Sequence, residues 1–395
     1  MNVQKIKADF PILKDVTYLD SASTSLTPQP VLDAISDYYH GYKANVGRGV
    51  YRMAQMADQR YRDAHRKAAN FIGSQEGVTI FTRNSTESIN IVARGLTWKK
   101  GQSIVTTLLE HHSNLLPWMR LREKGLDLQI LTPDRMGMID PADFEKAITK
   151  ETRLVAVTQL SNSLGTVLPV KEICKICHEK GAALLVDGAQ SVPHMPIDVK
   201  DINCDFLAFS GHKMLAPMGS GVLWMRKEEG VEPLLVGGGM VADVGEDGYE
   251  IKKGYEGFEA GTPDISAGIG LGAAADYLSQ VGMEEIHRHE QKLTARLLAG
   301  LEQIKGVVVY GPGSCGMARG GVVSFAVEGL LPHEVALMLD QASSICVRSG
   351  YHCCIPLMKH LGLKNGTVRA SLYLYNTEED IEKLLTSLEQ IARMA

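Results

Sequence analysis

The sequence lacks the features that mark membrane proteins, nucleic-acid-binding proteins and small disulfide scaffolds. No run of about 18 apolar residues occurs, so we expect no membrane span and no membrane partner. The formal net charge of -5 leaves no basic footprint for nucleic acid. Seven cysteines in 395 residues are an odd number and too sparse for a disulfide framework. Because sparse free thiols suit a reducing compartment and the first residues carry no apolar signal core, we expect a cytoplasmic protein.

The length and the apolar pattern predict two domains. A chain of 395 residues exceeds the usual size of one core. Over residues 78–224, apolar runs alternate with helical patterns, which favours an α/β fold with a mostly parallel sheet and helices on both faces. The pattern then changes to that of a smaller α+β unit. We expect a large domain over residues 15–264 and a small C-terminal domain over residues 265–395, joined by the N-terminal segment 1–14.

The apolar runs also predict individual elements. The expected strands of the sheet are residues 78–81, 103–107, 128–131, 154–160, 183–186, 206–209 and 221–224. The expected helices of the large domain include residues 116–124, 142–149 and 170–180. In the small domain we expect helices at residues 266–280, 284–304, 333–341 and 378–394, and strands at residues 307–310 and 321–327.

Lys213 follows the apolar run 206–209 and a Ser-Gly-His turn. A lysine held at a strand end can be buried, and burial disfavours the ammonium, so its pKa falls and the amine becomes nucleophilic. Such an amine can form a Schiff base with an aldehyde cofactor. The alternative is a solvated loop lysine, which general exposure favours for any lysine taken alone.

Two upstream segments suit the same cofactor. The strand pattern 183–186 ends at Asp187, whose carboxylate could pair with a pyridinium nitrogen, and Gln190 could donate to a phenolic oxygen. Ser85 and Thr86 open a helical pattern, and free N–H groups at a helix start bind anions such as phosphate. The alternatives are an Asp that caps a turn and an ordinary helix N-cap.

Together these residues resemble the fold-type I, class V aminotransferase family over nearly the whole chain. The family's cofactor motifs are matched in order by Ser85, Thr86, Asp187, Gln190 and Ser210-Gly211-His212-Lys213. The resemblance implies a fold-type I transferase dependent on pyridoxal 5'-phosphate, with Ser210 and His212 at the phosphate. The segment "FEAGTPD" resembles one whose threonine, here Thr262, reaches the cofactor phosphate of a neighbouring subunit, so a homodimer is expected.

The segment "RSGYHCCIPLMKHLG" resembles the active-site cysteine loop of group II, SufS-like cysteine desulfurases. The family pattern Arg-x-Gly-His-His-Cys makes Cys353 the nucleophile. Tyr351 stands where the family usually has His, and Cys354 follows where a small residue is usual. The second departure leaves open which thiol carries sulfur, and the register favours Cys353. We expect His352 and Arg348 to favour its thiolate.

Other roles come from the same resemblance. His111 corresponds to the ring that stacks on the pyridine, where an imidazole can also move protons near neutral pH. We expect the adjacent His112 to point elsewhere. Asn162 matches the cofactor-side and substrate-side Asn, and Arg369 matches the Arg that binds the substrate carboxylate with its planar fork. Arg348 is expected to assist at the cysteine loop.

The resemblance implies conversion of L-cysteine to L-alanine. Lys213 removes the Cα proton, Asp187 keeps the cofactor nitrogen protonated, and Cys353 takes the substrate sulfur as a persulfide. Because no long flexible arm surrounds Cys353, we expect a SufE- or SufU-like acceptor protein to collect the sulfur for iron–sulfur cluster or other sulfur-compound assembly.

Three alternatives stay open, and no metal site is expected. A selenocysteine lyase shares nearly all these residues, whereas another class V enzyme, such as a transaminase or kynureninase-like hydrolase, would not need Cys353. A non-catalytic sulfur-assembly scaffold is disfavoured by Lys213 and Asp187. The Cys-x-x-Cys of Cys174 and Cys177 indicates two neighbours on one helix, because no second ligand pair follows at zinc-like spacing.

Overall fold

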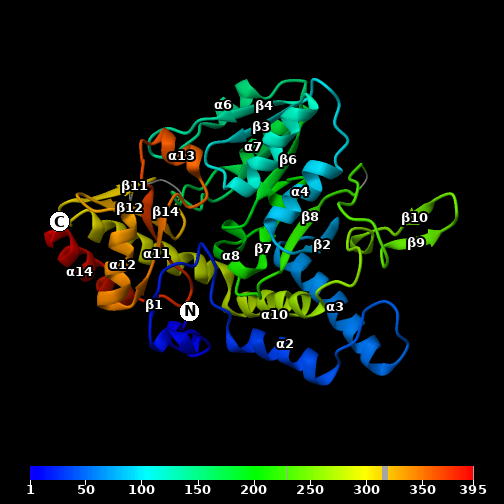
Figure 1. Cartoon of the computed structure of the whole chain (residues 1–395), viewed down its shortest axis with the longest axis horizontal. Coiled ribbons are helices and arrows are strands. Elements are labelled where there is room, and N and C mark those ends of the chain that lie inside the picture. The colour runs from blue at the N-terminus through cyan, green and yellow to red at the C-terminus, as the bar shows by residue number, and fades with distance from the viewer. Residues whose placement is uncertain (229, 314–318, 395) are drawn as a thin grey trace.

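A mixed seven-stranded sheet forms the centre of the computed structural model, which describes residues 1–228, 230–313 and 319–394 (Figure 1). The strands are β2 (Val78–Thr82), β3 (Ser103–Thr107), β4 (Asp127–Leu131), β5 (Thr152–Thr158), β6 (Ala183–Asp187), β7 (Phe206–Ser210) and β8 (Gly221–Met225). Their order is β2-β8-β7-β6-β5-β3-β4. The pairs among β3 to β7 are parallel, whereas β8 runs antiparallel to both of its neighbours. The predicted mostly parallel sheet is confirmed.

Helices cover both faces of this sheet. They include α2 (Gln29–Gly41), α3 (Arg52–Phe71), α4 (Ser85–Gly95), α5 (Leu116–Leu121), α6 (Pro141–Ala147), α7 (Val170–Glu179), α8 (Ser191–His194), α9 (Val199–Ile202) and α10 (Ile265–Val281). Along β5, Val155 and Val157 join the core cluster that contains α7 and α10. Leu154 and Ala156 join the opposite cluster, with α4 and α5. This alternation follows from the two-residue period of a strand, and each large aliphatic side chain buried in this way contributes about 1.5–3 kcal/mol.

Several predicted elements end earlier than expected, including the helices predicted over residues 142–149 and 284–304, which end at Ala147 and Leu301. The helix predicted over residues 116–124 stops at Leu121 and continues as the 3-10 turn η3 (Arg122–Lys124), which Gly125 ends at a φ of 78°. The strand predicted over residues 154–160 begins at Thr152 and stops at Thr158, whose N–H donates to Glu110 Oε1 rather than to a neighbouring strand. The glycine conformation sets the limit of η3, and the contact with the Glu110 side chain sets the limit of β5.

The C-terminal part contains a second, antiparallel sheet. Its strands are β11 (Val307–Tyr310), β12 (Val322–Val327), β14 (Arg348–Gly350) and β15 (Thr367–Ser371), in the order β11-β12-β15-β14. The accompanying helices are α11 (Met283–Leu301), α12 (Pro332–Ser343), α13 (Ile355–His360) and α14 (Glu378–Met394). One core cluster joins three of these helices, α11, α12 and α14, to the sheet. These elements gather on one side of the molecule (Figure 1).

The N-terminal segment and one hairpin complete the fold. Helix α1 (Val3–Lys7) precedes the short strand β1 (Thr17–Tyr18), which pairs in parallel with β13 (Ile345–Cys346). Helix α10 packs on α2 and α3. The hairpin β9 (Val241–Val244) and β10 (Tyr249–Ile251) projects from the side opposite the C-terminal sheet (Figure 1). The domain division at residue 264 stays a proposal, and positions 314–318 and 395 of its small domain lie outside the described residues.

The cysteines on α7 belong to the core. Val170, Ile173, Cys174 and Cys177 are all buried and fall at the spacing of one helix face. All six described cysteines are free thiols, and Cys315 lies outside the described residues. Within the described ranges, no cluster of three or more metal-ligating side chains occurs, and no helix has the length and apolarity that a membrane span needs. The expectation that the Cys-x-x-Cys pair shares one helix is confirmed.

Candidate active site

A polar cavity of about 170 Å³ opens where β5, β6 and β7 end. Ten of the residues selected from the sequence line it: Ser85, Thr86, His111, Asn162, Asp187, Gln190, Ser210, His212, Lys213 and Arg348. Parallel strands end at the same sheet edge, which explains why segments far apart in the sequence meet here. Of the remaining selected residues, Cys353, Arg369 and Thr262 lie outside this lining.

Lys213 and Asp187 lie at two neighbouring strand ends. Lys213 closes the 3-10 turn η4 (Gly211–Lys213) that follows β7, and burial lowers the pKa of its amine to about 8. The Asp187 carboxylate opposes that shift. Asp187 is itself buried at the end of β6, where Oδ1 accepts a hydrogen bond from Ala189 N at 3.0 Å and burial raises the pKa. The cavity therefore holds a nucleophilic amine beside a buried acid.

Hydroxyl groups cluster where α4 begins. Asn84 is the N-cap, and its Oδ1 accepts from Glu87 N at 3.1 Å. Ser210 Oγ accepts from Ser85 N at 2.9 Å and donates to Ser85 Oγ at 3.0 Å. A Cβ on Gly221 would lie 2.6 Å from the Cα of Asn84, so only glycine lets β8 approach this closely. The helix start is thus held rigidly against the sheet, with hydroxyls around an anion-attracting terminus.

His111 is neutral, which corrects the expectation of proton exchange near neutral pH. Its Nδ1 accepts from Ser113 N at 3.1 Å, so the ring proton lies on Nε2. Burial, and then the charge of Lys213, lower the pKa of His111 to about 3. A ring that protonates only below about pH 3 keeps one charge state through the physiological range.

Glu110, which the sequence analysis did not find, supports the sheet edge at which the cavity lies. Its Oε1 accepts from Thr107 Oγ1 at 2.8 Å and from Thr158 N at 3.0 Å, and its Oε2 accepts from Asn114 Nδ2 at 2.6 Å. Burial raises the pKa of Glu110 to about 8. These contacts join the ends of β3 and β5 to the turn that carries His111. The available signal was a charged residue three positions after a buried strand.

Arg369 lies on β15 and is fully buried. Nη1 donates to Asn162 O at 2.9 Å, and Nη2 donates to Asp20 Oδ1 at 3.0 Å and to Ser23 Oγ at 2.8 Å. Its Nε has no hydrogen-bond partner among the described residues. Arg348, paired with Arg369 across the sheet, also donates to Ser23 Oγ at 3.2 Å. The segment containing Asp20 and Ser23 was not selected from the sequence.

Cys353 lies in a left-handed turn. His352 and Cys353 have φ angles of 51° and 59°, which non-glycine residues rarely adopt and which other contacts must hold in place. Cys353 O accepts from His112 N at 2.8 Å, and His112 Nε2 accepts from Ile355 N at 3.2 Å. Arg348 Nη2 donates to Cys353 Sγ at 3.4 Å. His112 does not line the Lys213 cavity, as expected, and instead braces the cysteine turn at Cys353 and Ile355.

His352 does not supply positive charge to the Cys353 thiol, contrary to expectation. The ring is buried, and its Nε2 forms a hydrogen bond with Thr367 Oγ1 at 2.8 Å. Burial and the nearby arginines lower the pKa of His352 to about 2, so the ring stays neutral. The cation beside the thiol is Arg348.

The two adjacent thiols have different surroundings. Cys353 is half-buried beside Arg348, whereas Cys354 is fully buried and donates to Asn162 Oδ1 at 3.2 Å. Burial raises the pKa of Cys354 to about 12, so this thiol keeps its proton. Of the two thiols, Cys353 alone lies partly exposed beside a cation.

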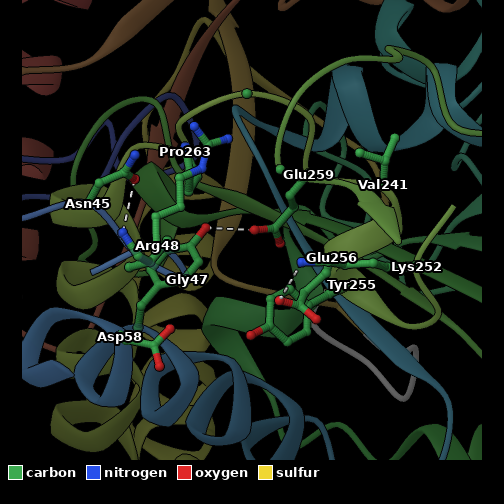
Figure 2. Close-up of a pocket in the computed structure, with 14 residues that line it drawn as sticks. Asn45, Gly47, Arg48, Asp58, Val241, Lys252, Tyr255, Glu256, Glu259 and Pro263 are labelled. Carbon is green, nitrogen blue, oxygen red and sulfur yellow. Dashed lines mark hydrogen bonds and ion pairs between the residues drawn. The ribbon is translucent and has the colours of Figure 1, made fainter. Parts of the chain in front are cut away.

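Thr262 lies at a different cavity. Its Oγ1 accepts from Asn45 Nδ2 at 3.3 Å, and Thr262 is exposed. Figure 2 shows a neighbouring cavity that Gly261 and Pro263 line, with Asn45 and Arg48 on one side and Glu256 and Glu259 on the other. Thr262 is thus separate from the Lys213 cavity of its own chain.

Comparison with known proteins identifies the family. Residues 17–384 match the Aminotransferase class-V family, so the chain belongs to it and has the fold-type I architecture expected from the sequence. The chain is 47% identical to a probable cysteine desulfurase of Methanothermobacter thermautotrophicus, covering 100% of this chain and 99% of that protein. It is 46% identical to a probable cysteine desulfurase of Pyrococcus abyssi, covering 99% of this chain and 98% of that protein.

Solved structures agree with the sequence relatives. The apo cysteine desulfurase of Thermococcus onnurineus NA1 superposes with a TM-score of 0.96 at 46% identity, covering 99% of this chain and 98% of that chain. The cysteine desulfurase CsdA of Escherichia coli superposes with a TM-score of 0.92 at 31% identity, covering 100% of this chain and 99% of that chain. The resemblance of the sequence motifs to class V aminotransferases and to cysteine desulfurases is confirmed.

Proposed function

We propose that this chain is a cysteine desulfurase of the group II type, which converts L-cysteine to L-alanine and holds the sulfur as a persulfide on Cys353. One observation carries the proposal: Cys353 lies in a braced left-handed turn with Arg348 Nη2 3.4 Å from its sulfur. Arg348 also lines the cavity that contains Lys213 and Asp187. The relatives named probable cysteine desulfurases, at 47% and 46% identity, support the same activity.

The residues around Lys213 fit pyridoxal 5'-phosphate. The lowered pKa of Lys213 suits Schiff-base formation, and Asp187 would hold the proton of the ring nitrogen. Ser85, Ser210 and His212 would hold the phosphate, and the buried Nδ1 of His212 has no protein partner among the described residues. We assign Thr86 to the same phosphate end, and His111, Asn162 and Gln190 to the ring. When bound, the cofactor supplies the electron sink for a carbanion at Cα.

The chain's own groups then divide the work. Arg369 binds the substrate carboxylate through its guanidinium, which the contact with Asp20 Oδ1 keeps oriented. Lys213 takes the Cα proton of cysteine. The Cys353 thiolate attacks the substrate sulfur, so an S–S bond forms as the substrate C–S bond breaks, and the carbon fragment leaves as alanine after protonation. Arg348 stabilises the thiolate before attack.

We further propose a homodimer in which Thr262 serves the partner's site. Thr262 is exposed and lies beside Asn45, away from its own Lys213 cavity. Large apolar side chains shortly after Asn45 in the chain are exposed: Val50 is 90% exposed and Tyr51 is 57% exposed. Exposed apolar groups of this kind favour burial against a second copy, and two-fold closure satisfies both sites at once.

Sulfur would leave Cys353 through an acceptor protein. Tyr351 and Ile355 flank the turn and are exposed, whereas the turn itself is braced by His112. A braced thiol cannot travel to a distant acceptor, so the acceptor must dock at the turn. We propose a SufE- or SufU-like protein in the cytoplasm, with iron–sulfur cluster or other sulfur-compound assembly as the destination.

Quantification of alanine and sulfide from L-cysteine tests the proposed function. Wild-type protein loaded with pyridoxal 5'-phosphate should form both products with a reductant present, and Cys353→Ser should form almost none. Equal alanine formation by Cys353→Ser would show that Cys353 is not the nucleophile, and no alanine from the wild-type protein would favour another class V reaction. Turnover of selenocysteine but not of cysteine would instead identify a selenocysteine lyase.

A further inference from the structure

Cys354 has no part in the proposed reaction, yet its side chain contacts the site directly. Its thiol donates to Asn162 Oδ1 at 3.2 Å, and the residue is fully buried. Because burial raises the pKa of Cys354 to about 12, the S–H proton is present at any physiological pH. The Cys354 thiol can thus donate to Asn162 Oδ1 throughout this pH range.

Asn162 is a junction between three parts of the site. Its Nδ2 donates to His352 O at 2.8 Å, and its main-chain O accepts from Arg369 Nη1 at 2.9 Å. It also lines the Lys213 cavity. An amide has distinct donor and acceptor ends, and a half-turn of the Asn162 amide would oppose Nδ2 to the thiol proton and Oδ1 to His352 O. The Cys354 donor and the His352 O acceptor therefore favour the same amide orientation, the one that ties Asn162 to the cysteine turn.

We propose that Cys354 is a positioning residue: its S–H fixes the Asn162 amide, and through it the His352–Cys353 turn relative to the Lys213 cavity. Cys354 does not itself carry sulfur, because its thiol points to Asn162 whereas the Cys353 thiol points to Arg348. The role of Asn162 toward substrate rests on the proposed function, whereas the role of Cys354 in orienting the turn is independent of it.

The test compares Cys354→Ala, which removes the donor, with Cys354→Ser, which keeps one. Cys177→Ala is the matched control, since Cys177 is a buried thiol on α7 outside the site. In holoenzyme, Cys354→Ala should raise KM for L-cysteine by about threefold to tenfold, the loss expected for one weak hydrogen bond, with kcat changed less. Cys354→Ser and Cys177→Ala should stay near the wild-type KM.

A second readout does not depend on desulfurase activity. The alkylation rate of Cys353 by iodoacetamide, followed by mass spectrometry of its peptide, should rise about twofold or more in Cys354→Ala, because a turn held less firmly exposes the thiol. Cys354→Ser should restore the wild-type rate. Unchanged alkylation and KM in Cys354→Ala, or equal effects of Ala and Ser, would overturn the positioning role. If wild-type protein makes no alanine, the proposed function fails while the alkylation result still decides the role of Cys354.

Discussion

The Arg348 guanidinium donates a hydrogen bond to the Cys353 sulfur at 3.4 Å. A neighbouring cation favours a thiolate, and the thiolate is the nucleophilic form. The charge therefore comes from β14, five residues earlier in the chain, because the adjacent His352 is buried and neutral. Chain proximity alone would have assigned it to the histidine.

Removing the Arg348 charge should slow sulfur transfer. We expect Arg348→Gln to lower alanine formation about tenfold, since it removes a charged hydrogen-bond donor from the Cys353 sulfur. The rate of Cys353 alkylation by iodoacetamide should fall in this variant, and Arg348→Lys should restore it in part. An unchanged alkylation rate in Arg348→Gln would show that Arg348 does not activate the thiol.

Lys213 should be the single point of covalent cofactor attachment. Borohydride reduction of the holoenzyme should fix the cofactor on the Lys213 peptide, because this amine has the lowered pKa that imine formation requires. Lys213→Ala should abolish the trapped link, whereas the exposed Lys171→Ala should leave it intact. Peptide mapping by mass spectrometry gives the answer, and a label on another lysine would refute the assignment.

Cofactor loading should depend on pH near 8. Because burial lowers the pKa of Lys213 to about 8, the free-amine fraction of apoprotein rises as pH passes through this value and then levels off. The rate of reconstitution with pyridoxal 5'-phosphate, followed by absorbance, should rise from pH 6.5 to about 9 and then plateau. A rate that keeps rising beyond pH 10, as for a solvated lysine, would contradict the burial effect.

Subunit mixing tests whether Thr262 acts across a dimer. Lys213→Ala dimers should be inactive, and Thr262→Ala dimers should bind the cofactor phosphate more weakly. A hybrid of the two subunits has one site with both residues intact, so it should recover up to about half of the wild-type activity. Analytical ultracentrifugation supplies the assembly state. Fully active monomers, or hybrids no better than the parents, would exclude the shared site.

The sequence predicted the elements that depend on local pattern. The apolar strands before Asp187 and Lys213 and the polar start of α4 were all recognisable from alternation and from the residues that end each run. Because β6 and β7 pair in parallel, Asp187 and Lys213 lie at the same edge of the sheet. The pairing of Arg369 with Asp20 was not predictable, because it joins positions 349 residues apart.

Burial explains why the expected protonation of two histidines was wrong and why Glu110 was missed. The sequence shows His111 and His352 as polar groups near catalytic motifs, and a free imidazole there would titrate near neutral pH. Tertiary packing around the two rings lowers their pKa values to about 3 and about 2. Glu110 escaped notice for the same reason, because only its buried contacts distinguish it from a loop carboxylate.

The position of the persulfide tests the central claim most directly. Holoenzyme turned over briefly with L-cysteine, alkylated and digested should carry one added sulfur on Cys353 of the peptide that contains both thiols, located by fragmentation. Cys354→Ser should carry the same addition and keep substantial alanine formation, whereas Cys353→Ser should bind the cofactor, carry no addition and form almost no alanine. Added sulfur on Cys354 alone, or normal turnover by Cys353→Ser, would contradict the account.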